Sequence, residues 1–138
     1  MFSFFVPGQP QGKGRPRHKG KITYTPRKTK EYEKQVVKCF TDKYPKYIPI
    51  EENMAVMIGI VAQYKIPKSL SKAKKALIAE GNVYPLVKPD CDNIGKAIMD
   101  ALNGYAYKDD KQVVNCLIEK KYAVNDEDIG VKVFVGEV

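Results

Sequence analysis

Aspartate residues are concentrated in one short part of an otherwise basic chain. Of the sixteen acidic residues, five lie between positions 90 and 110, and all five are aspartates: Asp90, Asp92, Asp100, Asp109 and Asp110. The formal net charge of the whole chain is +8. Short carboxylate side chains are hard oxygen ligands that suit Mg²⁺ or Mn²⁺. The pattern therefore indicates a divalent-metal site, and a metal beside a basic surface favours chemistry on phosphodiesters.

Spacing alone leaves two interpretations of the first aspartates open. Asp90 or Asp92 could simply cap a helix, because a carboxylate at the N-cap accepts hydrogen bonds from free backbone amides. Asp92, Lys96 and Asp100 follow one another at four-residue intervals, so they share one helix face. They could form a ladder of ion pairs along the helix. Alternatively, Lys96 could stand one turn beyond the carboxylates and meet a phosphate or a departing oxygen.

The pair Asp109–Asp110 favours the metal site. A helix from residue 92 to residue 102 rises about 15 Å, and the following segment 103–109 can span up to roughly 23 Å. The chain can thus return beside the helix and bring the pair next to Asp90 and Asp92. Carboxylates that meet without a cation repel one another, and a divalent metal removes that cost. Such a metal would polarise a phosphoryl oxygen and activate an attacking water.

The positive charge is confined to residues 11–30. Eight basic residues lie there without an acidic one, which equals the net charge of the chain, and the charges of the other 118 residues cancel. Such a field is the footprint expected for a nucleic-acid backbone, and a solvated basic loop without a partner is the alternative. Interspersed glycines and a proline predict a loop. The predicted DNA contacts are Lys13, Arg15, Arg17, Lys19, Lys21, Arg27 and Lys28.

The sequence lacks the residues and motifs that other catalytic mechanisms require. The single histidine, His18, lies in the basic segment, so a Ser-His-Asp or Cys-His arrangement is disfavoured. The chain has neither a P-loop nor a GxGxxG motif, and no nucleotide cofactor is expected. Its three cysteines form no CxxC pair, which disfavours zinc and disulfides and favours a reduced, cytoplasmic setting. Cys91 is expected to be buried, and no apolar run reaches the roughly 18 residues of a membrane span.

The pattern of apolar residues predicts one small domain, residues 1–138, of the α+β (mixed α/β) class with a mixed β-sheet and about three helices. Strands are expected at 2–6, 54–64, 113–123 and 129–135, with a short extended piece at 21–24. Helices are expected from Thr25, as N-cap, to about Tyr44, from 69 to 80, and from Asp90 or Asp92 to about Leu102. The turn at 125–128 predicts that the last two strands form a C-terminal β-hairpin.

The motifs resemble, in their order, one family of nucleases. Residues 88–96 read KPDCDNIGK, residues 100–104 read DALNG, and residues 109–114 read DDKQVV. Together with GKGRPR at 12–17 and YTP at 24–26, these segments are similar to the RusA family of Holliday junction resolvases. That family's pattern is DxDNxxK, a DAL segment and DDxQV. The similarity runs through nearly the whole chain.

The resemblance implies an Mg²⁺- or Mn²⁺-dependent endonuclease of DNA recombination and repair, commonly borne by a phage or prophage. Family members act as homodimers on four-way DNA junctions. Residues 11–30 would then be the DNA-contacting segment and residues 88–114 the acidic metal site. The matched residues are Asp90, Asp92 and Asp110 as metal ligands, Lys96 as the catalytic lysine, Asp109 as the first of the acidic pair and a further candidate ligand, and Asn93 as an asparagine that would orient an aspartate.

The number of active sites also bears on the assembly. Two symmetric nicks in a junction need two sites, which a two-fold dimer supplies. An interpretation from another class keeps the basic surface but makes the aspartates structural caps, and the protein is then a non-catalytic nucleic-acid-binding module. A metal phosphohydrolase acting on free nucleotides would explain the aspartates but leave the basic segment without a role.

Overall fold

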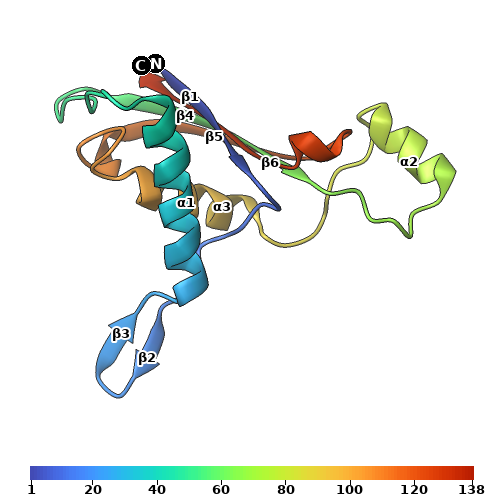
Figure 1. Cartoon of the computed structure of the whole chain (residues 1–138), viewed down its shortest axis with the longest axis horizontal. Helices are drawn as coiled ribbons and strands as arrows, with labels where there is room; N and C mark the ends of the chain where they lie inside the picture. Colours follow the sequence, from blue (N-terminus) through green and yellow to red (C-terminus); the bar gives the residue numbers. More distant parts are fainter.

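A mixed four-stranded sheet carries the helices that frame the acidic segment (Figure 1). The computed structural model describes residues 1–138 and confirms the α+β class, the mixed sheet and the three helices. The helices are α1 (Arg27–Lys43), α2 (Lys72–Ala79) and α3 (Cys91–Leu102), and two 3-10 turns are η1 (Asp110–Gln112) and η2 (Asp126–Asp128). The strands are β1 (Phe2–Pro7), β2 (Arg17–Lys19), β3 (Ile22–Tyr24), β4 (Val56–Tyr64), β5 (Val113–Tyr122) and β6 (Gly130–Glu137).

The strands of the main sheet lie in the order β1-β6-β4-β5. β4 pairs in parallel with β5 and antiparallel with β6, and β6 pairs antiparallel with β1. The last two strands are joined by the short turn η2 and run in opposite directions, as the predicted C-terminal hairpin requires. They differ from a simple hairpin because β4 lies between them and pairs with both. The long connection from 65 to 112 allows this, since parallel strands need a crossover.

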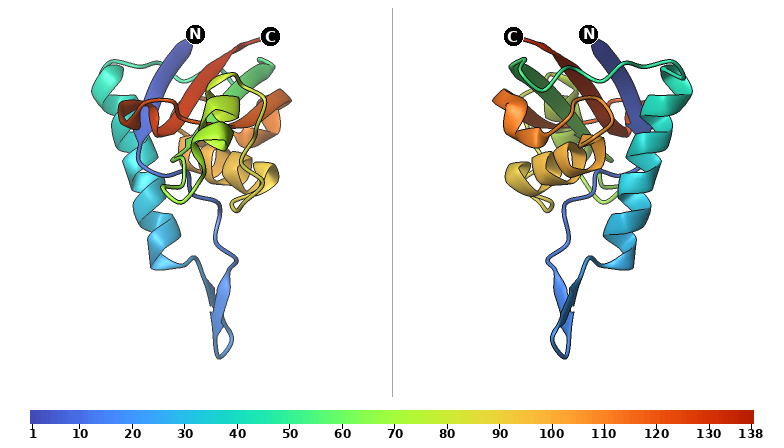
Figure 2. Two further views of the ribbon diagram at one scale, coloured as in Figure 1. Left: turned by 90° about the vertical axis from the view of Figure 1, so that its right-hand side faces the viewer. Right: turned by 90° about the vertical axis from the view of Figure 1, so that its left-hand side faces the viewer.

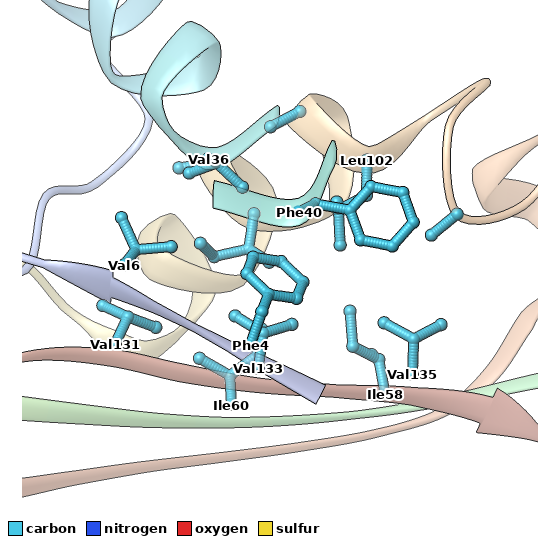
Figure 3. Packing of buried hydrophobic residues seen from close by; sticks show 14 of the residues in the cluster. Phe4, Val6, Val36, Phe40, Ile58, Ile60, Leu102, Val131, Val133 and Val135 are labelled. Carbon is cyan, nitrogen blue, oxygen red and sulfur yellow. The ribbon is translucent and has the colours of Figure 1, made fainter. Parts of the chain in front are cut away.

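Helices α1 and α3 pack on one face of this sheet and build the core (Figure 3). Val36 and Phe40 of α1 pack there with side chains of β1, β4 and β6. The buried residues of α3 are Ile94, Gly95, Ala97, Ile98, Ala101 and Leu102. Each large apolar side chain buried in this way contributes about 1.5–3 kcal/mol. The packing therefore holds α3 in a fixed orientation, with its polar side turned away from the core.

The first helix begins one residue later than the sequence predicts. Pro26 is the N-cap residue, and its backbone is still extended, with φ −55° and ψ 144°. Its carbonyl accepts the first helical hydrogen bond, from the Lys30 backbone N–H at 3.1 Å. The prediction of Thr25 as N-cap is therefore wrong, and no side chain caps this helix end.

The short extended piece predicted at 21–24 is one arm of the β2–β3 hairpin, which projects away from the domain (Figures 1 and 2). Gly20 makes the turn with φ +64°, a conformation that glycine adopts without steric cost. All residues of both arms are exposed. Periodicity therefore did not reveal the first arm, because no buried face imposes alternation on it.

Helix α2 stands at the other end of the molecule, away from α1 and α3 (Figure 1). Its N-cap is Ser71, whose hydroxyl accepts a hydrogen bond from the Lys74 backbone N–H at 3.2 Å. None of the helices combines the length and the apolar character that a membrane crossing requires.

Candidate functional site

An open depression lies between α3 and the beginning of β5. Its volume is about 480 Å³, and the apolar and thiol part of its wall comes from Met99, Val113, Cys116 and Ile118. One face of α3 supplies three charged side chains, since residues four apart stand above one another on a helix, and η1 supplies the fourth. The charged lining consists of Asp92, Lys96, Asp100 and Asp110.

Lys96 lies among these carboxylates without forming an ion pair. The five ion pairs of the molecule all involve other residues, and the Lys96 side chain is exposed. The ladder of ion pairs that the spacing along α3 allowed is therefore not formed. The ammonium group of Lys96 is available to an anion that enters the depression.

Hydrogen bonds of the Asp110 backbone and of the neighbouring residues fix the turn η1, and with it Asp110. The Asp110 backbone N–H donates to Asn103 Oδ1 at 3.2 Å, which ties the turn to the end of α3. Asp109 caps the turn: its carboxylate accepts a hydrogen bond from the Lys111 backbone N–H at 3.0 Å. Asp109 is thus engaged in a local structural role, whereas Asp110 lines the depression.

Gln112 completes this arrangement; it belongs to the DDKQVV segment, but its role was not identified from the sequence. Its Oε1 accepts a hydrogen bond from the Asp109 backbone N–H at 2.9 Å, so the two residues form a capping box. Its buried Nε2 donates to the carbonyl oxygens of Glu51 at 2.6 Å and Met54 at 3.1 Å. The spacing of Asp109 and Gln112, three residues apart, is the signal that could have revealed this role.

The two neighbouring aspartates of η1 differ in acidity. The pKa of the Asp110 carboxyl is raised, first by desolvation and then by the carboxylates of Asp109 and Asp100, while Lys96 opposes the rise. The pKa of the Asp109 carboxyl is lowered, chiefly by the hydrogen bond from the Lys111 backbone amide. A carboxyl whose charged form is disfavoured by other carboxylates is one that a cation would stabilise.

Asp90 occupies the N-cap position of α3, but its side chain does not cap the helix. Asp90 Oδ1 instead accepts a hydrogen bond from Asn93 Nδ2 at 2.6 Å. The preceding residue is fixed by the Tyr64 hydroxyl, which donates to the Pro89 carbonyl at 2.7 Å. Asp90 is exposed and is not among the residues that line the depression. The structure therefore brings Asp92 and Asp110 together and leaves Asp90 at the start of the helix.

These donors fit a hard divalent cation by their chemistry, although no protein cage is assembled. No three His, Cys, Asp or Glu side chains are grouped in an arrangement that could hold a metal ion. Mg²⁺ is commonly bound by one or two carboxylates together with waters and substrate phosphates, and needs no such cage. Asp92 and Asp110 supply two carboxylates to one open depression, which is a donor set of this kind.

Two features of early α3 follow from its closeness to β5, the edge strand of the sheet. A Cβ on Gly95 would lie 2.5 Å from Ile118 Cδ1, so a larger residue here would require the end of the Ile118 side chain to move. Cys91 is exposed, contrary to the prediction, because it begins the helix beside the open edge of the sheet. Its Sγ lies 3.9 Å from the Ile118 carbonyl oxygen.

Most of the predicted DNA contacts are exposed on or near the projecting hairpin (Figure 2). Arg27 forms an ion pair with Glu31 at 2.9 Å, and both side chains remain largely solvated. The other exposed basic residues form no ion pair: these are Arg15, Arg17, Lys19, Lys21 and Lys28.

Lys13 is placed differently from the rest of the basic segment. Its side chain is only 15% exposed and forms ion pairs with Glu33 of α1 and, at 3.1 Å, with Asp100 of α3. Burial opposes its charged form, but the hydrogen bonds and charges of both carboxylates outweigh this effect and raise the pKa of Lys13. Its backbone N–H donates to the Asn93 carbonyl at 2.9 Å. Lys13 therefore joins the basic segment to the two helices.

Comparison with known proteins agrees with the motifs and the geometry. The family model described as Endodeoxyribonuclease RusA matches residues 7–134. The chain is also 36% identical over 141 residues to the uncharacterized protein YqaN of Bacillus subtilis (strain 168), and the alignment covers 98% of this chain and 95% of that protein. Both the acidic depression and the basic segment lie within the matched region. The chain therefore belongs to the RusA endodeoxyribonuclease family, whose members are junction-resolving nucleases.

Proposed function

We propose that this protein is a metal-dependent, structure-selective DNA endonuclease that resolves four-way junctions by paired, symmetric nicks. The observation that carries the proposal is the depression that Asp92 and Asp110 share with the unpaired ammonium of Lys96. Membership of the RusA family supplies the reaction class. The exposed basic residues of the segment 15–30 offer a surface for the phosphate backbone.

Asp92 and Asp110 would hold an Mg²⁺ or Mn²⁺ ion together with a substrate phosphate, and Asp90 is the third candidate ligand. Such an ion polarises a phosphoryl oxygen of the bond to be cleaved. Asp109 is not assigned as a ligand, because its carboxylate caps η1. Asn93 holds the Asp90 carboxylate through a 2.6 Å hydrogen bond and so orients it.

Lys96 would contact the substrate directly. Its ammonium group offers three N–H donors, and no carboxylate of the protein competes for them as an ion-pair partner. It would donate a hydrogen bond to the phosphodiester and stabilise the negative charge that grows on the departing oxygen. Stabilisation of developing charge by a preplaced donor is usually the largest single contribution to catalysis.

Resolution requires two cuts, and each chain contains one such depression. A homodimer with two-fold symmetry would present two sites related in the same way as the two strands that are cut. We therefore include a homodimer in the proposal. Its mass is measurable by analytical ultracentrifugation, with and without junction DNA.

The test is cleavage of a labelled four-way junction in Mg²⁺ or Mn²⁺, with linear duplex of the same sequence as the substrate control. The wild-type protein should nick the junction at two symmetric positions and leave the duplex intact. Asp92→Asn and Asp110→Asn should abolish cleavage while junction binding is retained, because each variant removes a carboxylate that would hold the metal. Asp126→Asn, which removes an exposed carboxylate elsewhere, is the matched control.

Normal cleavage by either variant would remove that aspartate from the site. Binding without nicks in both metals would instead support a non-catalytic nucleic-acid-binding module. The non-catalytic module requires the aspartates to act as structural caps, and this requirement is not met at the start of α3. Asp90 makes no cap hydrogen bond with its side chain, whereas Asp109 does.

A further inference from the structure

A second concave surface lies at the base of the β2–β3 hairpin, next to the residues that precede α3. Its volume is about 470 Å³, and no acidic side chain lines it. We call it the cationic groove, after its four basic lining residues: Arg15, Arg17, Lys28 and Lys88. Lys88 comes from outside the basic segment 11–30, so the fold adds it to this group.

The charges of the cationic groove are not compensated by the protein. None of its four basic side chains takes part in an ion pair, and all four are exposed. The same segment does use ion pairs elsewhere, since Lys13 pairs with Glu33 and Asp100, and Arg27 pairs with Glu31. Like charges gathered in a concavity repel one another and focus a positive potential. An anion in the groove would relieve that repulsion.

The wall of the groove is held by close packing rather than by a mobile loop. A Cβ on Gly12 would lie 2.9 Å from Pro89 Cβ, and a Cβ on Gly14 would lie 2.6 Å from Thr29 Oγ1. The Gly14 backbone N–H donates to that Thr29 hydroxyl at 3.0 Å. These two glycines therefore let the main chain lie directly against the start of α1 and the approach to α3. The basic side chains project from a backbone that is fixed at both ends.

The cationic groove and the acidic depression that holds Asp92 and Asp110 both lie next to the N-terminal end of α3. Pro89 lines the groove and Asp92 lines the depression, and three residues span at most about 11 Å of chain. Successive phosphates of one DNA strand advance about 3.4 Å along the helix axis. A single strand can therefore occupy both surfaces with phosphates that are a few nucleotides apart.

We propose that the cationic groove binds a backbone phosphate of the DNA strand close to the bond that is cleaved in the depression. The proposal rests on the proposed function for its substrate class. It divides the basic residues into three roles: Lys13 supports the fold, the groove residues hold the strand near the cut, and Lys19 and Lys21 at the hairpin tip contact DNA farther away. Lys88 becomes a DNA contact although it lies outside the basic segment.

The test compares two double variants that remove equal charge. Lys28→Ala with Lys88→Ala empties part of the groove, and Lys72→Ala with Lys74→Ala removes two exposed lysines of α2 as the control. Binding of a four-way junction is measured at several salt concentrations without divalent metal. The groove variant should reduce the slope of log K against log salt by up to about 1.8, or 0.9 for each lost contact. The control variant should leave the slope within experimental error of the wild-type value.

A second measurement localises the contact. Single phosphates around the branch point are replaced, one at a time, by neutral methylphosphonates. At one or two positions beside the cut, the replacement should weaken binding of the wild-type and control proteins more than binding of the groove variant, because two of the four basic partners of that phosphate are already missing. If the groove variant loses affinity at every position by the same factor as the wild type, the proposal is overturned. An unchanged salt slope would also overturn it.

Failure of the proposed function would look different. Because binding is measured without cleavage, a wild-type protein that never cuts the junction could still show the coupling between the groove and one phosphate. Conversely, a protein that cuts the junction normally but shows no coupling would refute phosphate binding by the cationic groove and would leave the proposed endonuclease activity unaffected. Thermal unfolding of each variant confirms that the exposed substitutions leave the fold intact.

Discussion

Replacing Lys13 separates a role in folding from a role in DNA binding. The residue belongs to a basic segment, yet its ammonium group lies 3.1 Å from Asp100 Oδ2 and also contacts Glu33. Lys13→Met keeps most of the unbranched apolar side chain and removes the ammonium group and its charge. The two carboxylates, one on α1 and one on α3, are then left facing each other without a cation, so the packing of the helices should weaken.

The magnitude follows from the geometry and the burial. At an effective dielectric constant of about 20, a pair at this separation attracts by about 5 kcal/mol, and desolvation of the ammonium offsets much of that. The side chains of Lys13, Glu33 and Asp100 remain 15%, 24% and 27% exposed. The loss should lie between the roughly 1 kcal/mol of a surface pair and the roughly 3–5 kcal/mol of a broken buried pair. We expect about 2 kcal/mol, or a fall in Tm of about 6–8 °C.

The assay combines urea denaturation with junction binding over a range of salt concentrations. Lys21→Met, an exposed lysine at the turn of the hairpin without an ion pair, is the matched control. The control should change stability by less than about 0.5 kcal/mol and lower the salt slope by about 0.9 if Lys21 contacts a phosphate. Lys13→Met should show the reverse behaviour. A stable Lys13→Met protein with a reduced salt slope would refute the reasoning and return Lys13 to the DNA interface.

Two further predictions concern the turn that carries Asp110. Asp109→Ala should lower the free energy of unfolding by about 1 kcal/mol through loss of the cap and retain most of the junction cleavage that Asp110→Asn abolishes; equal loss of cleavage in both variants would assign a catalytic role to Asp109. Gln112→Ala should cost about 2–4 kcal/mol in urea denaturation, because two carbonyl oxygens lose their buried donor. Lys111→Ala next to it should cost less than about 0.5 kcal/mol, and a similar loss in both variants would show that the buried hydrogen bonds contribute little.

Local features of the fold were predictable because short-range physics controls them. The helix period places Asp92, Lys96 and Asp100 on one face whatever the rest of the chain does. The strands at both ends and the three helices also follow from apolar spacing and turn residues. The errors at element ends are shifts of one to three residues: Thr25 is not the N-cap of α1, α2 begins at Lys72 rather than at 69, and β4 begins at Val56 rather than at 54. Neighbouring backbone conformations differ little in free energy at such ends.

Strand pairing was less accessible to the same reasoning. A short turn between β5 and β6 suggested direct neighbours, but β4 takes the place between them. β4 buries every second side chain from Val56 to Tyr64, and its backbone pairs with a strand on both sides. A turn constrains only the two strands that it joins, whereas the order of a sheet is decided by all strands competing for the core.

The sequence by itself determined which residues are candidates for catalysis and DNA binding. These are the clustered aspartates, one lysine a helical turn beyond Asp92, and a segment that holds the whole net charge. Only the tertiary structure decided which of these residues line the same surface and which support the fold. It placed Asp110 and Asp92 in the lining of one depression, turned Lys13 inward, and added Lys88 to the cationic groove. The physical reason is that side-chain chemistry and helical period are local properties. Which charges meet, and which remain free for a ligand, depends on contacts between segments far apart in the chain.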